Sequence, residues 1–170
     1  MGRCNLGFEL RKWTAAAIPR FACHHPDRLT TLIDRLADPD LTEQCFDMRS
    51  FGFFRYRDDD EGGSICTRCA FGWATTIPAF AAIGLKAQWE KDYLGGYQML
   101  HVHYQGYCGW TTAAEFFGIS EHTTKALFGT EPRTKEEEIA ILRNFLAAVR
   151  ERQADLQLGR LTAVKEAVHA

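Results

Sequence analysis

The sequence lacks three features that would place a protein in a class at once: an excess of one charge, a long apolar run and a low-complexity segment. Its 170 residues carry 20 lysines and arginines against 22 aspartates and glutamates, which gives a formal net charge of -2. A protein whose main partner is a phosphate backbone usually has a basic excess or a basic stripe. The charge balance therefore weighs against nucleic acid as the partner.

No stretch approaches the roughly 18 to 20 apolar residues that cross a membrane. Near the N-terminus, Arg11 and Lys12 interrupt the apolar residues that a secretory signal would need. We therefore expect a cytoplasmic protein without a membrane partner. In that reducing compartment the six cysteines are expected to be free, catalytic or metal-bound rather than paired in disulfides.

The apolar content, 46% with twelve phenylalanines and four tryptophans, indicates a globular chain with a substantial core. In the segment PDRLTTLIDRLADPD, Leu29, Leu32, Ile33 and Leu36 recur at i, i+3, i+4 and i+7. This spacing predicts an amphipathic helix that begins near Pro26.

Further local signals predict the rest of the chain. The segment TRCAFGWATTI is expected to be helical and to stop or kink at Pro78, with PAFAAIG as another helical piece ended by Gly84. An aromatic segment with a short strand is expected to lead into a solvated loop at residues 58–64, and YQMLHVHY alternates like a strand. Capping signals for three later helices are Thr112 with Glu115, Ser120, and Thr134 with Glu137.

Together these signals predict a mainly α fold, a compact multi-helix single domain with a small β element. We expect residues 24–150 to form the core domain. Residues 1–23 are expected to be an N-terminal extension and residues 151–170 a helical tail, in which Leu161, Val164 and Val168 have helical spacing.

The stretch from Thr112 to Phe128 resembles a helix-turn-helix, because Ala114, Gly118 and Ile119 occupy the small, turn and apolar positions of that motif. The residues of the second helix that could reach DNA are His122, Thr123 and Lys125. Base reading mostly uses arginine, lysine, asparagine and glutamine, so a single lysine makes a poor reader. Two short helices packed at a steep angle are the favoured interpretation.

The segment YCGWTTAAEFFG is similar to the turn before the catalytic helix of papain-like, bacteriocin-processing peptidases, which would make Cys108 a nucleophile. Those enzymes place their histidine base well downstream of the cysteine. Here the downstream histidines are His122 and the penultimate His169, whereas His101 and His103 precede Cys108. The favoured interpretation is a buried, unreactive cysteine at the start of a helix.

Cys66 and Cys69 form a CxxC motif, and His101, His103 and Cys108 could complete a zinc site. Two cysteines at this spacing can both reach one tetrahedral ion, and His101 and His103 would share one face of a strand. The sequence has no second CxxC motif. Cys69 as a core residue beside Trp73 is therefore favoured, and zinc remains the alternative to a protein without a cofactor.

Two segments, TRCAFGWA and AAEFFGISEHTTKALFG, follow one another in an order that resembles a family of small bacterial and phage proteins of unknown function. The matching residues are Cys69, Gly72, Trp73, Ala114, Gly118, Leu127 and Phe128. The family's first cysteine falls opposite Ser64, whereas this chain has Cys66. The resemblance covers about residues 24 to 150 and implies an architecture without an established activity.

The sequence therefore favours a non-catalytic protein-binding or regulatory module over an enzyme. The expected contact surfaces are the aromatic segment from Phe51 to Tyr56 and the tail beyond Glu151. Homo-oligomerisation stays open. So do three alternatives: a zinc-stabilised module, a helix-turn-helix regulator through residues 112–128, and a cysteine hydrolase through Cys108.

Overall fold

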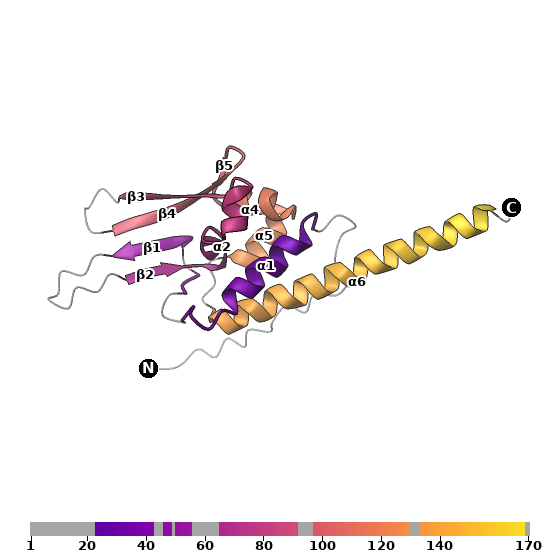
Figure 1. Cartoon of the computed structure of the whole chain (residues 1–170), viewed down its shortest axis with the longest axis horizontal. Coiled ribbons are helices and arrows are strands. Elements are labelled where there is room, and N and C mark those ends of the chain that lie inside the picture. Colours follow the sequence, from indigo (N-terminus) through magenta and orange to yellow (C-terminus); the bar gives the residue numbers. More distant parts are fainter. Residues whose placement is uncertain are drawn as a thin grey trace.

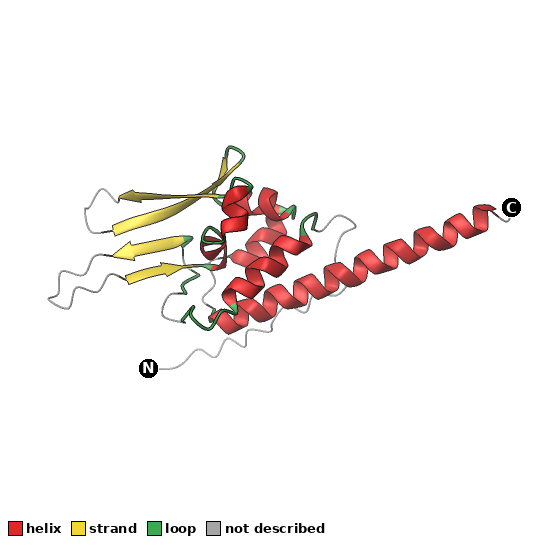
Figure 2. Ribbon diagram, viewed as in Figure 1, coloured by secondary structure: helices red, strands yellow, loops and turns green. Residues whose placement is uncertain are grey.

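The structure is a computed structural model that describes residues 23–42, 46–48, 50–55, 65–91, 97–129 and 133–168. Helices gather at one end of the molecule and strands at the other (Figures 1 and 2). In chain order the elements are α1 (Pro26–Leu36), β1 (Gly52–Arg55), β2 (Ile65–Arg68), α2 (Ala70–Ala74), α3 (Pro78–Ala82), β3 (Lys86–Lys91), β4 (Tyr97–Tyr104), β5 (Tyr107–Cys108), α4 (Trp110–Phe117), α5 (Glu121–Phe128) and α6 (Lys135–Val168).

The fold is a mixed α/β fold, so the prediction of a compact multi-helix domain with a small β element is wrong. The strands form a five-stranded sheet in the order β2-β1-β4-β3, with β5 also paired to β4. All of these pairings are antiparallel. The predicted strand at residues 97–104 is confirmed as β4, which pairs with three of the other strands.

One face of β4 lies against the core. Leu100, Val102 and Tyr104 are buried, whereas Met99 on the other face is 46% exposed. This is the alternation that the sequence predicts, because successive side chains of a strand point to opposite faces. Gly52 on β1 supports the close packing, since a Cβ there would lie 2.8 Å from Cβ of Leu100.

The helix predicted after Pro26 is confirmed as α1, and its stripe of Leu29, Leu32, Ile33 and Leu36 is buried. The predicted break at Pro78 is also confirmed, because α2 ends at Ala74 and α3 begins at Pro78. The helix expected over TRCAFGWATTI is shorter than predicted. Residues 67 and 68 belong to β2 instead, where Thr67 pairs with Phe53 and Arg68 with Gly52.

Two of the three predicted helix caps are confirmed. The Ser120 hydroxyl accepts a hydrogen bond from the Thr123 N–H (3.1 Å) at the start of α5. Thr134 and Glu137 form a reciprocal capping box at the start of α6, with N–H to side-chain oxygen distances of 2.8 and 3.1 Å.

The third cap, Thr112 with Glu115, is wrong. Helix α4 already begins at Trp110, with Gly109 as its N-cap residue. Thr112 is buried inside the helix, and its hydroxyl donates a hydrogen bond to the Val102 carbonyl oxygen of β4 (3.2 Å). A contact with a distant strand therefore outweighs the local capping signal.

The hydrophobic core lies where α1, α2, α4, α5 and the first half of α6 meet the inner face of the sheet. Its centre is aromatic. Phe117 stacks on Phe128 (5.3 Å between ring centroids), and Phe71 and Phe116 contact the same cluster edge-on or tilted. Buried aromatic rings contribute large apolar areas, so this cluster stabilises the packing of the helices.

Helix α6 is far longer than the other helices and runs along α1 before it projects beyond the rest of the molecule (Figure 1). It continues without a break across residue 150, the predicted boundary between core domain and tail. In the part of the chain that the structure describes, no helix combines the length and apolarity that a membrane crossing demands.

Candidate functional site

The two halves of α6 differ in exposure. The residues from Ile139 to Val149 include a buried stripe of Ile141, Leu142, Phe145, Leu146 and Val149. From residue 151 to 161 the described side chains are exposed, except for the half-buried Arg152 and Leu156. We call residues 151–168 the distal half of α6.

The distal half carries two large exposed apolar side chains, Leu158 (67% exposed) and Leu161 (62%). The exposed Ala154 lies seven residues before Leu161. Side chains at i, i+4 and i+7 share one face of a helix, so Ala154, Leu158 and Leu161 form a stripe. We call these three residues the apolar stripe.

The apolar stripe does not continue the core-facing stripe of the same helix. At 3.6 residues per turn, successive residues are rotated by about 100° around the axis. On this basis the half-buried Arg152 and Leu156 continue the core-facing side, and the apolar stripe lies roughly on the opposite side. A partner could therefore reach it without displacing α1.

The chain attaches this helix to the body firmly. Arg150 donates a hydrogen bond to the Thr30 hydroxyl of α1 (3.0 Å), at the point where α6 leaves the body. At the other end of the contact, the Lys135 ammonium group donates to the Leu41 carbonyl oxygen just beyond α1. Both contacts join α6 to α1 and to the residues just after it.

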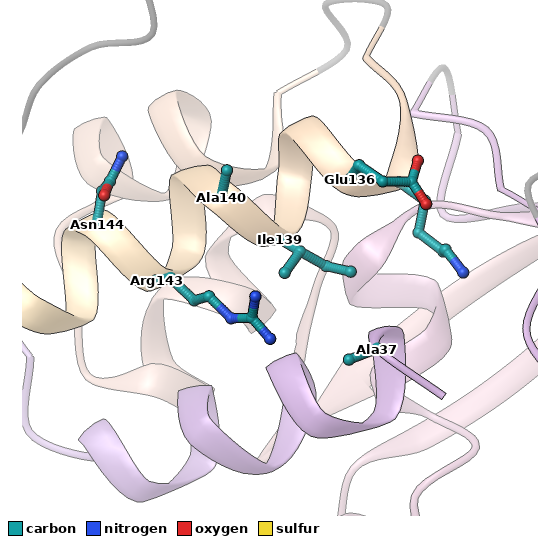
Figure 3. A pocket seen from close by; sticks show the side chains of 7 residues that line it. Ala37, Glu136, Ile139, Ala140, Arg143 and Asn144 are labelled. Atoms are coloured by element: carbon teal, nitrogen blue, oxygen red, sulfur yellow. The ribbon is translucent and has the colours of Figure 1, made fainter. Parts of the chain in front are cut away.

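A pocket of about 450 Å³ lies between the end of α1 and the first turns of α6. It is lined by Ala37, Lys135, Glu136, Ile139, Ala140, Arg143 and Asn144. Ile139 and Arg143 extend from α6 toward α1 and Ala37 (Figure 3). The lining contains no cysteine or histidine, so neither the nucleophile nor the metal ligands considered from the sequence fall in this pocket.

The candidate nucleophile Cys108 lies on β5, one residue before the N-cap of α4. It is exposed, so the prediction of a buried cysteine is wrong: it stands on the short outer strand of a hairpin. A two-residue turn, Gln105 (φ 50°) and Gly106 (φ 87°), connects β4 to β5. Two consecutive positive φ angles suit the twist of a hairpin and fix its register. As a result, His103 lies directly opposite Cys108.

Directly opposite residues of an antiparallel pair have Cβ atoms about 5 Å apart. The structure therefore brings together a cysteine and a histidine that the peptidase comparison rejected on chain order. His101, two residues earlier on the same strand face, lies 3.5 Å from a Glu90 carboxylate oxygen. These residues sit on the face of the sheet that does not pack against the core.

Cys69 is another candidate metal ligand with a described side chain. It lies in the core and not on the outer face of the sheet with His101 and His103. It is fully buried at the N-cap of α2, where its Sγ accepts a hydrogen bond from the Gly72 N–H (3.4 Å). Burial raises the pKa of the Cys69 thiol to about 12. The side chain of Cys66 lies outside the described residues, and within those residues no three His, Cys, Asp or Glu side chains cluster as metal ligands.

The Gly-Trp pair that follows Cys69 has a structural explanation. A Cβ at Gly72 would lie 1.6 Å from the Phe51 carbonyl oxygen, so only glycine fits there. The Trp73 ring is contacted by the guanidinium groups of Arg35 and Arg68, at 5.3 and 5.2 Å from its centroid. These residues hold α2 against α1 and the sheet.

Helices α4 and α5 join through Gly118 in the left-handed conformation, as the helix-turn-helix interpretation requires. A Cβ at Gly118 would collide with His24, so this corner packs against the segment before α1. His122 and Lys125 are exposed, but Thr123 is buried, with its hydroxyl 2.8 Å from that of Ser120. Of the three proposed base contacts, Thr123 is poorly placed to reach a groove.

The aromatic segment predicted as a contact surface contributes to the core at its first residue. Phe51 is half-buried and contacts the Trp110 ring (4.7 Å between centroids) and the Phe71 ring (5.9 Å). The side chains from Phe53 to Tyr56 lie outside the described residues. The other predicted surface, the tail beyond Glu151, corresponds to the distal half of α6.

Comparison with known proteins gave no match: neither a family model, nor a curated protein, nor a solved structure is significantly similar to this chain. The family resemblance drawn from the Cys69 and Ala114 segments therefore stays a prediction.

Sequence reasoning found Leu161 but missed Leu158 and the stripe that the two form. The available signal was the seven-residue spacing from Ala154 to Leu161. It also missed the buried pair of Arg133 and Glu138, for which the local sequence gives no signal beyond an acidic first helical turn.

Proposed function

We propose that this protein is a non-catalytic protein-interaction module, and that the distal half of α6 is its contact element. The observation that carries the proposal is the exposure of Leu158 and Leu161 on one side of a helix that projects from the body. Among the large apolar side chains that the structure describes, these two are the most exposed.

Single exposed leucines are common on protein surfaces and need no explanation. Two leucines and an alanine aligned on one face of a projecting helix are a different case. Burying one leucine side chain is worth about 1.5 to 3 kcal/mol. Covering both leucines could therefore supply a large part of the binding free energy of a weak complex. Amphipathic helices commonly bind protein grooves or other helices through residues at this spacing.

The charges of the distal half support a protein partner over a nucleic acid. Residues 151–168 contain three basic side chains, Arg152, Arg160 and Lys165, and three acidic ones, Glu151, Asp155 and Glu166. A helix that binds phosphates would carry an excess of basic residues along one side. A balanced helix suits a surface of mixed charge.

The proposal is tested by comparing three forms of the full chain as affinity baits: wild type, L158E/L161E and Q153E/R160Q. The first variant places two negative charges on the apolar stripe. The second changes the net charge by the same amount at exposed positions off the stripe. Captured proteins are identified by mass spectrometry, and their binding is then measured again with purified components.

The expected result is at least one partner whose affinity falls about tenfold or more, equivalent to about 1.4 kcal/mol, with L158E/L161E but not with Q153E/R160Q. If all captured partners bind the three baits equally well, the distal half of α6 is not the contact element. Circular dichroism of both variants confirms that α6 remains folded.

A further inference from the structure

Strand β3 lies at one end of the sheet, where a further strand could be added. The strand order is β2-β1-β4-β3, and among the described strands β3 pairs only with β4 (Figure 2). Five of its six residues are exposed. The backbone N–H and C=O groups along the outer side of an edge strand can pair with another chain. The edge at β3 is therefore a candidate contact surface, separate from the distal half of α6.

The opposite edge of the sheet, at β2, is partly covered by the chain itself. Phe46 forms a parallel bridge with Arg68 at the end of β2. Beside it, the Asp47 N–H donates a hydrogen bond to the Arg68 carbonyl oxygen (3.1 Å). Proteins often protect an edge strand by covering it with another segment. Within the described residues, no strand or bridge covers β3 in this way.

The register between β3 and β4 shows which residues of β3 share the outer face of the sheet. Three of them lie opposite residues 103, 101 and 99 of β4, which are on the face turned away from the core: Lys86, Gln88 and Glu90. Directly opposite residues of an antiparallel pair point to the same face. A basic and an acidic side chain therefore stand at the two ends of one exposed row. Among the described side chains, none forms an ion pair with Lys86.

We propose that β3 pairs with β3 of a second copy of the chain, in the antiparallel direction and centred on Gln88. This inference goes beyond the proposed function, because it concerns a different surface. Lys86 of each copy then lies opposite Glu90 of the other copy, and two-fold symmetry repeats this contact. On the inner face, Ala87 of each copy lies opposite Trp89 of the other, so a small side chain meets a large one.

The charges select this occupant and this register. In one continuous sheet, outer-face residues of one copy must lie opposite outer-face residues of the other. Among the two-fold registers that satisfy this condition, the one centred on Gln88 places Lys86 opposite Glu90. Lysines on an edge usually discourage pairing with an unrelated strand, whereas here each one meets a carboxylate. Opposite charges directly across a strand pair stabilise it, and like charges destabilise it.

The contact is small, so the dimer is weak and depends on concentration. Its five paired residues, 86–90, span about 17 Å at about 3.4 Å per residue. Sedimentation velocity on the full chain, from about 1 µM to about 1 mM, covers the affinities of such a contact. The weight-average mass is expected to rise from 19.3 kDa toward twice that value, in the wild type and in L158E/L161E alike. A wild type that stays monomeric, or self-association that is lost in L158E/L161E, overturns the inference.

Charge reversal tests the predicted contact between Lys86 and Glu90. K86E and E90K should each associate about tenfold more weakly than the wild type, because each places like charges opposite one another twice. K86E/E90K exchanges the two charges and should regain the wild-type association. K91E makes the same charge change just beyond the paired residues and should behave as the wild type does. Single variants that associate normally, or a double variant no better than the single ones, overturn the inference.

A disulfide tests the register. The exposed Cys108 is first replaced by serine, and Q88C or K91C is then added. Directly opposite residues of an antiparallel pair have Cα atoms about 4.5 to 5.5 Å apart, within the range of a disulfide. Oxidised glutathione should therefore link C108S/Q88C into a covalent dimer in much higher yield than C108S/K91C, in which the new cysteines lie at opposite ends of the pair. Equal yields from the two variants contradict pairing centred on Gln88.

Discussion

Arg133 and Glu138 form an ion pair inside the protein, with 2.9 Å between Nη1 and Oε2 and side-chain exposures of 4% and 0%. The Arg133 guanidinium also donates to the carbonyl oxygens of Ala126 and Leu127, at 3.2 and 2.9 Å. It therefore ties the last turn of α5 to the first turn of α6. Through this pair the start of the long helix is fixed to the core.

Glu138 should make the stability of the protein depend on pH. Burial raises the pKa of its carboxyl group to about 7, although Arg133 opposes this shift. The unfolded chain has a glutamate pKa near 4.3, so between the two values the folded state binds more protons than the unfolded state. The stability that Glu138 contributes is complete below about pH 4 and is lost as the pH rises through about 7.

We expect the free energy of unfolding of the wild type to fall, relative to that of E138Q, by on the order of 3 kcal/mol between about pH 4.5 and pH 8. Urea denaturation of both proteins across this range gives the difference directly. Glutamine keeps a side-chain oxygen that can accept a hydrogen bond from Arg133, but its amide group does not titrate. Parallel pH profiles for the two proteins would show that Glu138 has an ordinary pKa.

Two glycines are expected to respond to alanine in opposite ways. G72A should destabilise the protein by about 3 kcal/mol or more, because the new Cβ would meet the Phe51 carbonyl oxygen at 1.6 Å. G159A should stabilise α6 by about 0.5 to 1 kcal/mol, because Gly159 lies within a helix and a Cβ there meets nothing within 4 Å. Urea denaturation measures both changes. A G72A variant as stable as the wild type would contradict the packing of α2 against Phe51.

The cysteines are expected to differ widely in reactivity. Cys108 is exposed, whereas burial raises the pKa of the Cys23 thiol to about 11 and that of the Cys69 thiol to about 12. Because the thiolate is the reactive form and burial also shields the Cys69 thiol from the reagent, iodoacetamide at pH 7.5 should modify Cys108 much faster than Cys69. Peptide mapping at timed intervals measures each rate. Equal rates at Cys69 and Cys108 in the folded protein would contradict the buried N-cap role of Cys69.

The sequence predicts those parts of the fold whose signals are local. The stripe of α1, the break at Pro78, the Ser120 cap and the capping box at Thr134 each depend on residues a few positions apart, and the structure confirms all four. These signals act within one turn or one helix face. Long-range packing does not override them here.

The sheet could not be predicted in the same way. Strand β3 has the sequence KAQWEK, in which five of six residues are exposed and only Ala87 and Trp89 are apolar, so its apolar signal is weak. Strands β1 and β2 have four residues each. Strand β1 pairs with β2 and with β4. Strand β4 lies far along the chain from β1, so this pairing gives no local signal in the sequence. Thr112 fails as a cap for the same reason, since its hydroxyl binds Val102.

The distal half of α6 could be predicted only in part from the sequence. Leu161 is visible in the sequence as part of a helix-prone tail. Its exposure depends on how far along α6 the contact with α1 extends. Arg150 and Thr30 form a hydrogen bond near the end of that contact. That contact is long-range, so the sequence could indicate a surface in the tail but not the side of the helix that faces solvent.

The most direct measurement of the central proposal is photo-crosslinking in cells of the organism that encodes the protein. A photoreactive phenylalanine replaces Leu158 or Leu161 in the full chain, and position 153 or 160 serves as the control. We predict crosslinked adducts at 158 and 161 that are absent or much weaker at 153 and 160, and the mass of each adduct shows whether the partner is a second copy. Equal yields at all four positions, or no adduct at 158 and 161, would contradict the assignment of the distal half of α6 as the contact element.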